Sequence, residues 1–354
     1  MELRTLLQQT LTMGGSDMFI IPGSRVMVKV NGRFEPITDK ILSPVNTQEL
    51  ISETYRMAGQ RDEKELLTKG DDDFSFTLEK LCRFRCNAYR QRGTLAATYR
   101  VVAFGLPDEN KLNIPEMVIK QADFLSGLIL VAGAAGNGKS TTLACMIKHI
   151  NHTRSGHIIT VEDPIEYLHP HGKSLVSQRE VPNDAPTFST ALRAALRQAP
   201  DVIMLGEMRD YDTMQTAITA AETGHLILSS LHTVGAAKTI DRIIDAFPPN
   251  QQTQIRIQLS MVLKAVISQR LVPTLDGEML PVFEVMTVNS AIQTMIREGK
   301  THQIDNVIYN GSAEKTMLSM DLQLLSLYKQ GKIDKETAIL YAINPEALKK
   351  RLAV

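Results

Sequence analysis

The stretch from Gly133 to Ser140 constrains this chain more than any other, because it matches the phosphate-binding pattern G-x-x-x-x-G-K-[ST]. A short apolar segment at 127–132 precedes it and is typical of a buried parallel strand. Apolar residues at helical spacing follow it over 141–148. This order of strand, glycine loop and helix distinguishes a true phosphate loop from a chance match, or from a glycine-rich turn that binds nothing.

Each part of such a loop has a physical role in holding a nucleotide. The glycines let backbone N–H groups face an anion, and the helix N-terminus adds partial positive charge. We expect Lys139 to reach the β- and γ-phosphates of ATP, and Ser140 to hold Mg²⁺. The residues predicted to bind the nucleotide are Gly133, Ala134, Ala135, Gly136, Asn137, Gly138, Lys139, Ser140 and Thr141.

The composition argues against several other classes of protein. The chain has 354 residues, 43% of them apolar, and a formal net charge of zero, so nothing points to nucleic acid or an acidic membrane surface as a partner. No apolar run approaches the roughly 18 residues of a membrane span, and the N-terminus does not resemble a signal peptide. Cys82, Cys86 and Cys145 are too few and too poorly spaced for a disulfide framework or a zinc site. We therefore expect a cytosolic protein that does not insert into a membrane.

The order of patterns along the chain predicts an α/β protein. We expect an α+β domain at 1–104, a linker at 105–115, a parallel-sheet core at 116–288 and a helical region at 289–354. The helices of this last region should be short and broken at Gly311, Gly331 and Pro345. Period-two alternation at 74–78 and 83–90, with a hairpin signal at Asn31-Gly32, indicates strands in the first domain. Between 115 and 287 strands and helices alternate, which is typical of a parallel sheet covered on both faces.

Two apolar strands of the predicted core end in carboxylates, at the edge of the sheet where nucleotides bind. We expect Glu207 to be the general base that aligns the attacking water. The alternative role, an acid that caps the following helix, suits Asp210 better. Glu162 and Asp163 end the other strand and are predicted to assist by holding Mg²⁺, partly through water. The alternative there is a turn with solvated acids.

Histidines bracket a third strand. His225 and His232 are seven positions apart, so their side chains fall on opposite faces and should not form one metal site. His232 lies at the carboxyl end of the strand and is predicted to sense the phosphates. His225 is equally consistent with a catalytic role and with a hydrogen-bonded structural role.

Arginines crowd the end of the first domain with no lysine between them. One interpretation is a solvated strand face. The other is that guanidinium groups reach a phosphate across a domain or subunit interface, as arginine fingers do. The residues concerned are Arg83, Arg85, Arg90, Arg92 and Arg100.

Together these motifs resemble those of the secretion and type IV pilus ATPases. The resemblance rests on the phosphate loop and on the segments at 161–167, 192–201, 206–210 and 223–233, and it spans nearly the whole chain. It implies a hexameric ring whose subunits carry an N-terminal PAS-like domain and a RecA-like ATPase domain. It also implies that Arg85 and Arg100 reach the nucleotide from the N-terminal domain.

Within that family the chain is most similar to the pilus retraction, or twitching motility, ATPases. Assembly ATPases usually carry a four-cysteine zinc insertion after the last nucleotide motif, whereas 271–281 contains no cysteine. Retraction ATPases carry the motif Ala-Ile-Arg-Asn-Leu-Ile-Arg-Glu, which 291–298 resembles, with departures at Gln293, Thr294 and Met295. The phosphate loop departs as well, with Ala135 and Asn137 where Thr and Ser are usual. Asn137 still allows a tight turn and offers its N–H, so binding should survive.

The resemblance therefore implies a Mg-ATP-hydrolysing homohexamer that powers pilus retraction in the cytoplasm, against an inner-membrane pilus platform protein and with no nucleic acid. The same-class alternative is a pilus or pseudopilus assembly ATPase. A P-loop kinase would need an acceptor pocket and a lid, for which no segment is evident. An inactive accessory subunit is the third alternative, and Lys139 and Glu207 argue against it. We expect residues 290–298 to form an amphipathic helix that transmits motion, or, more simply, one that only packs.

Overall fold

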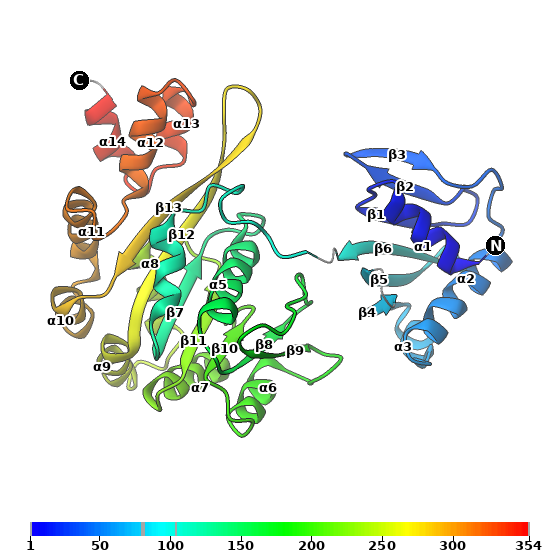
Figure 1. Ribbon diagram of the computed structural model, residues 1–354, viewed down its shortest axis with the longest axis horizontal. Coiled ribbons are helices and arrows are strands. Elements are labelled where there is room, and N and C mark those ends of the chain that lie inside the picture. The colour runs from blue at the N-terminus through cyan, green and yellow to red at the C-terminus, as the bar shows by residue number, and fades with distance from the viewer. Residues whose placement is uncertain (1, 79–81, 103–104, 353–354) are drawn as a thin grey trace. The chain divides into compact units, whose positions relative to one another are not determined.

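The computed structural model describes residues 2–78, 82–102 and 105–352, which form two compact units (Figure 1). One unit consists of Met1–Gly105 with Glu166–Leu168, and the other of Leu106–Ile165 with His169–Val354. Residues 103–104, where the predicted first domain ends, and 353–354, at the end of the predicted helical region, lie outside the described residues. In the described part of the chain, no helix has the length and apolar character that crossing a bilayer requires.

The first unit is built on a six-stranded antiparallel sheet. Its elements are α1 (Leu3–Thr12), β1 (Asp17–Ile20), β2 (Met27–Val30), β3 (Arg33–Pro36), α2 (Pro44–Met57), α3 (Lys64–Lys69), β4 (Asp71–Leu78), β5 (Cys82–Gln91) and β6 (Thr94–Val102). The strands lie in the order β3-β2-β1-β6-β5-β4. Buried and more exposed residues alternate along β4 and β5, so one face of the sheet forms a core with α1 and α2. Asn31 and Gly32 join β2 to β3 with φ of 48° and 81°, as the hairpin signal predicts.

The second unit contains a seven-stranded sheet and the helices around it. Its elements are α4 (Glu116–Lys120), η1 (Gln121–Asp123), β7 (Gly127–Ala132), α5 (Lys139–Thr153), β8 (His157–Glu162), β9 (Leu175–Glu180), α6 (Phe188–Ala195), β10 (Val202–Leu205), α7 (Tyr211–Glu222), β11 (Leu226–Leu231), α8 (Ala236–Asp245), α9 (Gln252–Val262), β12 (Leu263–Pro273), β13 (Met279–Thr287), α10 (Ser290–Glu298), η2 (Thr301–Gln303), α11 (Ile304–Ala313), α12 (Met320–Lys329), α13 (Lys335–Leu340) and α14 (Pro345–Leu352).

The strands of this sheet lie in the order β13-β12-β7-β11-β10-β8-β9. All neighbouring pairs are parallel except β12 and β13, which form an antiparallel hairpin at one edge. The alternation of strands and helices predicts a parallel sheet, and the antiparallel pair at its edge has a simple cause. Only residues 274–278 separate β12 from β13, which is too short for the crossover that a parallel pair needs.

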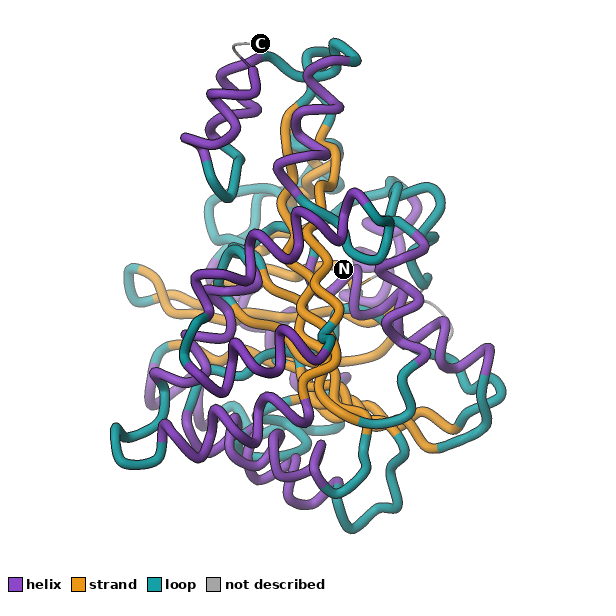
Figure 2. Tube along the Cα trace, turned by 90° about the vertical axis from the view of Figure 1, so that its left-hand side faces the viewer, coloured by secondary structure: helices purple, strands orange, loops and turns teal. Residues whose placement is uncertain are grey.

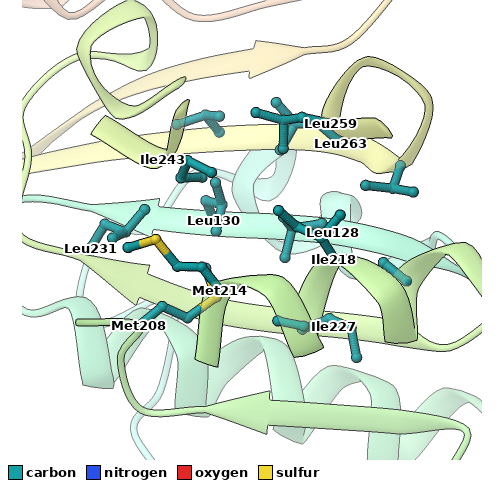
Figure 3. Close-up of a cluster of buried hydrophobic side chains, with 14 of the residues drawn as sticks. Leu128, Leu130, Met208, Met214, Ile218, Ile227, Leu231, Ile243, Leu259 and Leu263 are labelled. Carbon is teal, nitrogen blue, oxygen red and sulfur yellow. The ribbon is translucent and has the colours of Figure 1, made fainter. Parts of the chain in front are cut away.

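The strand that leads to the phosphate loop lies between two apolar layers, one on each face of the sheet. All six residues of β7 are buried. Leu128 and Leu130 belong to the layer formed with α7, α8 and α9 (Figure 3), whereas Ile129 and Val131 belong to the layer formed with α4 and α5. The parallel sheet is therefore covered on both faces, as predicted. This burial holds β7, and the start of the loop after it, in a fixed place.

The C-terminal helices pack in two places. Ile292 and Ile296 of α10 are fully buried against the layer that contains α9, whereas Arg297 is exposed, so α10 is amphipathic as predicted. Beyond it, α12, α13 and α14 pack on the outer part of the β12–β13 hairpin, and Figures 1 and 2 both place them beside it. Gly311, which the sequence suggests as a break between helices, lies inside α11.

Candidate nucleotide-binding site

The loop between β7 and α5 has a backbone conformation that favours glycine at three positions. Gly133, Gly136 and Gly138 have φ of 157°, 79° and 78°. At Gly133 a Cβ would lie only 2.6 Å from the carbonyl oxygen of Gln269, so no side chain fits there. The loop ends where the 15-residue helix α5 begins at Lys139, so the partial positive charge of the helix N-terminus lies at the end of the loop.

Lys139 lies across this loop. Its side chain is largely buried, and Nζ donates a hydrogen bond to the carbonyl oxygen of Ala134 at 3.0 Å. Nζ also lies 3.5 Å from Nδ1 of His232, which directly follows β11. Since β11 is the neighbour of β7 in the sheet, the carboxyl ends of these two strands bring Lys139 and His232 together.

Glu207 completes a row of three polar side chains at this edge of the sheet. Its Oε2 lies 3.2 Å from Nε2 of His232. An ammonium only donates and a carboxylate only accepts, so Nδ1 of His232 accepts from Lys139 and Nε2–H donates to Glu207. Sequence reasoning expects these three residues near the phosphates, and the fold brings them within contact of one another.

The carboxylate of Glu207 is held on its other side as well. The residue is 8% exposed, and its Oε1 lies 2.6 Å from Nη2 of Arg209. The backbone is fixed by Ser230, whose Oγ donates to the carbonyl oxygen of Gly206 at 2.6 Å and whose carbonyl accepts from the N–H of Met208 at 3.2 Å. The helix-capping role falls to Asp210, which accepts from the N–H of Thr213. Arg209 was not predicted to have a role, although its position two residues after Glu207 is the signal that could have suggested one.

Glu162 and Asp163 lie at the end of β8, which neighbours β10. The side chain of Glu162 is buried, and its Oε1 accepts hydrogen bonds from Thr160 Oγ1 at 2.6 Å and Gln178 Nε2 at 3.1 Å. Its Cα lies 3.5 Å from the position that a Cβ at Gly206 would take. Asp163 is exposed. The two acidic segments therefore meet at one edge of the sheet, as their positions in the sequence suggest.

His225 lies at the opposite end of β11 from His232. Its Nδ1 is 3.0 Å from the carbonyl oxygen of Ala220 and 3.1 Å from Thr223 Oγ1. A hydrogen bond from the ring N–H to the carbonyl oxygen of Ala220 is enough to explain the position of the His225 side chain. Of the two interpretations of His225, the geometry therefore favours the structural one.

Strand β12 supplies two contacts to the loop that the motifs do not predict. Gln269 Oε1 accepts a buried hydrogen bond from Thr142 Oγ1 at 2.6 Å, in the first turn of α5. Asn137, one of the departures from the usual loop, accepts through its Oδ1 from the N–H of Leu271 at 3.1 Å. The side chain of Asn137 thereby joins the loop to β12, a contact that the sequence indicates only through the unusual residue itself.

A cavity of about 500 Å³ adjoins the loop, within the size range of small-molecule sites. Gly138, Thr141 and Thr142 form its end nearest the loop. Its apolar lining comes from residues before β7 and from the β12–β13 hairpin, and polar side chains also line it. The apolar lining residues are Leu112, Ile114, Leu271, Met279, Leu280 and Pro281.

Arg85 and Arg100 belong to the first unit and lie opposite each other on β5 and β6. Arg85 Nε donates to Asp73 at 2.9 Å, and Arg100 Nε donates to Asp17 at 2.9 Å. The side chain of Arg100 is nevertheless 68% exposed. Their proposed contact with the nucleotide stays a prediction.

Comparison with known proteins places this site in a family. The family model described as Type II/IV secretion system protein matches residues 2–336. The Type IV pilus ATPase PilU of Pseudomonas aeruginosa is 40% identical over 343 residues, which cover 97% of this chain and 89% of that protein. The Type IV pilus retractation ATPase PilT of the same organism is 39% identical over 346 residues, covering 98% and 99%. The crystal structure of the pilus retraction motor PilT with bound ADP is 40% identical, with a TM-score of 0.90, and the match covers 99% of both chains.

Proposed function

Because this chain belongs to the type II/IV secretion system protein family, we propose that it is a PilT-like ATPase that uses ATP hydrolysis to retract a type IV pilus. The family resemblance that the motifs carry is thereby confirmed. The proposal depends above all on one observation. A chain similar to a pilus retraction motor along 99% of its length also places Lys139, His232 and Glu207 in contact at the end of the phosphate loop.

The chemistry follows from the positions of these side chains. Lys139 and the N–H groups at the start of α5 bind the phosphates and neutralise charge that develops on them. The carboxylate of Glu207 accepts a hydrogen bond from a water molecule and aligns it for in-line attack on the γ-phosphate, taking up its proton at Oε1 or Oε2. Arg209 and His232 hold this carboxylate in place by contacts to its two oxygens.

The oxygen donors at this edge of the sheet are of the kind that Mg²⁺ prefers. Ser140, Glu162 and Asp163 would hold it, partly through water, and all three offer the oxygen ligands that this ion prefers. Among the described residues no group of three or more His, Cys, Asp or Glu side chains is arranged to hold a metal. Phosphate oxygens and water would complete the shell of the ion. When bound, Mg²⁺ would screen the negative charge of the phosphates.

The motor would work as a homohexamer in the cytoplasm, at the inner face of the membrane. Its partner would be the platform protein of the pilus machine. Arg85 and Arg100 would reach a nucleotide from the N-terminal unit, either of the same subunit or of its neighbour. The exposed side of α10, around Arg297, would pass the motion on. Similarity to a pilus retraction motor along nearly the full length of both chains favours retraction over the assembly alternative.

A phosphate-release assay on the purified protein tests the proposal. We expect hydrolysis that depends on both ATP and Mg²⁺. Lys139→Ala should abolish it by removing the cation that meets the β- and γ-phosphates. A folded wild-type protein that binds ATP without releasing phosphate would instead indicate the inactive accessory subunit.

A further inference from the structure

Residues 107–114, which precede α4, form a compact turn with its own hydrogen bonds; we call this segment the entry turn. The N–H of Ile114 donates to the carbonyl oxygen of Glu109 at 2.9 Å, and that of Leu112 donates to Asp108 at 3.1 Å. Asp108 Oδ1 also accepts from the N–H of Asn110 at 3.1 Å, and Asn113 adopts a left-handed conformation with φ of 53°. The segment expected to be a linker is thus a preformed piece of backbone.

One side of the entry turn is fastened to the helix that follows the phosphate loop. Lys148 of α5 forms an ion pair with Glu109 at 3.0 Å and donates to the carbonyl oxygen of Pro107 at 3.3 Å. Both charged side chains are about 70% buried, with exposures of 28% and 30%. Cys145, one helical turn earlier, places its Sγ 3.9 Å from the same carbonyl oxygen. Burial raises the pKa of this thiol to about 12, so it stays protonated and can donate.

The other side of the entry turn forms a wall of the cavity beside the phosphate loop. Leu112, Asn113 and Ile114 line it, facing a space whose inner end is formed by Gly138 and Thr141. If the phosphates of a nucleotide occupy the loop, this adjoining cavity is the space that its ribose and base could enter. Leu271 and residues of β13 supply further apolar lining of the same cavity. The position of the entry turn therefore decides how well a base is enclosed.

We propose that the Lys148–Glu109 ion pair positions the entry turn against the nucleoside of bound ATP, so that this pair sets affinity for the nucleoside and not for the phosphates. The inference rests on the proposed function, because it requires that ATP occupies this site. Lys148 and Glu109 are positioning residues, since neither lines the cavity. They act through the backbone that carries Leu112 and Ile114.

The test compares two ligands on the full-length protein. One is a non-hydrolysable ATP analogue, and the other is inorganic triphosphate, which lacks the nucleoside. Lys148→Met and Glu109→Gln remove one charge each and keep the side-chain length. We expect each to weaken binding of the analogue about three- to tenfold, which corresponds to a partly buried ion pair. The double variant should be no weaker than the single ones, because the two residues act as one unit. Triphosphate affinity should stay within about twofold of wild type.

A matched control comes from α4. Glu116 and Lys120 form an exposed ion pair at 2.9 Å just after the entry turn, and neither lines the cavity. Glu116→Gln should change neither affinity. Thermal melting of every variant separates a folding defect from a binding defect, and a general loss of stability would affect both ligands alike.

Two results would overturn the inference while leaving the proposed function intact. In one, the affinities for the analogue and for triphosphate fall equally, which would mean that the pair acts on the phosphate loop through α5. In the other, neither affinity changes. A wild-type protein that binds neither ligand would overturn the proposed function itself, and the positioning role with it.

Discussion

Replacing Glu207 by glutamine should separate ATP binding from ATP hydrolysis. The amide keeps the size of the side chain and an oxygen that can accept from His232 Nε2, but it cannot take a proton from water. The loss of a positioned general base lowers a reaction rate by about 10²- to 10⁴-fold, so kcat should decrease by a factor in that range. The measurement is the rate of phosphate release at saturating ATP.

Binding should change little in the same variant. The substitution also removes the ion pair with Arg209, whose side chain is 71% exposed. Such a pair contributes about 0–1 kcal/mol, so the dissociation constant for ATP should move by less than about fivefold. The control is Glu222→Gln at the end of α7, where an exposed carboxylate accepts from Gln258 and the strand ends are not involved. A hydrolysis rate near wild type in Glu207→Gln would refute the assignment and make Glu162 the candidate base.

Three further predictions concern other parts of the chain. Arg85→Ala and Arg100→Ala should each lower kcat about tenfold or more with ATP affinity nearly unchanged, because arginine fingers act on transition-state charge; unchanged turnover in folded protein would remove them from the mechanism. Burial raises the pKa of Glu284 to about 7, above the usual value of about 4.3 for a glutamate. The folded state therefore binds more protons than the unfolded chain between about pH 5 and 7. The free energy of unfolding should fall as pH rises through this range. Glu284→Gln keeps an acceptor for the N–H of Ala236 and should flatten this dependence, gaining up to about 3 kcal/mol at pH 8 in denaturant titrations; an equally steep profile would contradict the assignment. Arg297→Ala, on the exposed side of α10, should keep hydrolysis within about threefold of wild type yet abolish pilus retraction in cells, and a variant that still supports twitching would return α10 to a packing role.

The parts of the site that the sequence predicts are those in which local pattern and function coincide. Three glycines at fixed spacing specify the loop, because the positive φ at Gly136 and Gly138 favours glycine and the close approach of Gln269 leaves no room for a Cβ at Gly133. Glu207 and His232 follow short buried strands, and parallel strands bring their carboxyl ends to one edge whatever the order of the strands. The meeting of these two residues with Lys139 could therefore be expected without knowing which strand neighbours which.

The parts that the sequence does not predict depend on pairings between distant segments. Thr142 and Gln269 are 127 positions apart, and Asn137 and Leu271 are 134 apart. Both contacts exist because β12 lies beside β7, which no local pattern indicates. The entry turn also depends on a contact between distant segments. Its polar composition predicts a linker, whereas an ion pair between Glu109 and Lys148 holds it against α5, the helix after the phosphate loop.

Gly311 illustrates the opposite error, in which a local rule is overridden by packing. A glycine is a plausible helix break, but this one lies inside α11, where a Cβ would meet Met317 Cγ at 3.0 Å. The close approach of Met317 explains why a small residue is accommodated in the helix. Tertiary packing, and not the end of the helix, accounts for this glycine.

The proposed function requires that ATP hydrolysis at this phosphate loop drives pilus retraction. It is tested most directly by measuring the retraction of fluorescently labelled pili in cells that lack the gene and carry either the wild-type chain or Lys139→Ala. We predict that the wild-type chain restores retraction, whereas Lys139→Ala leaves pili extended and more numerous on the surface. Retraction at the wild-type rate with Lys139→Ala, or fewer surface pili when the gene is deleted, would contradict the account.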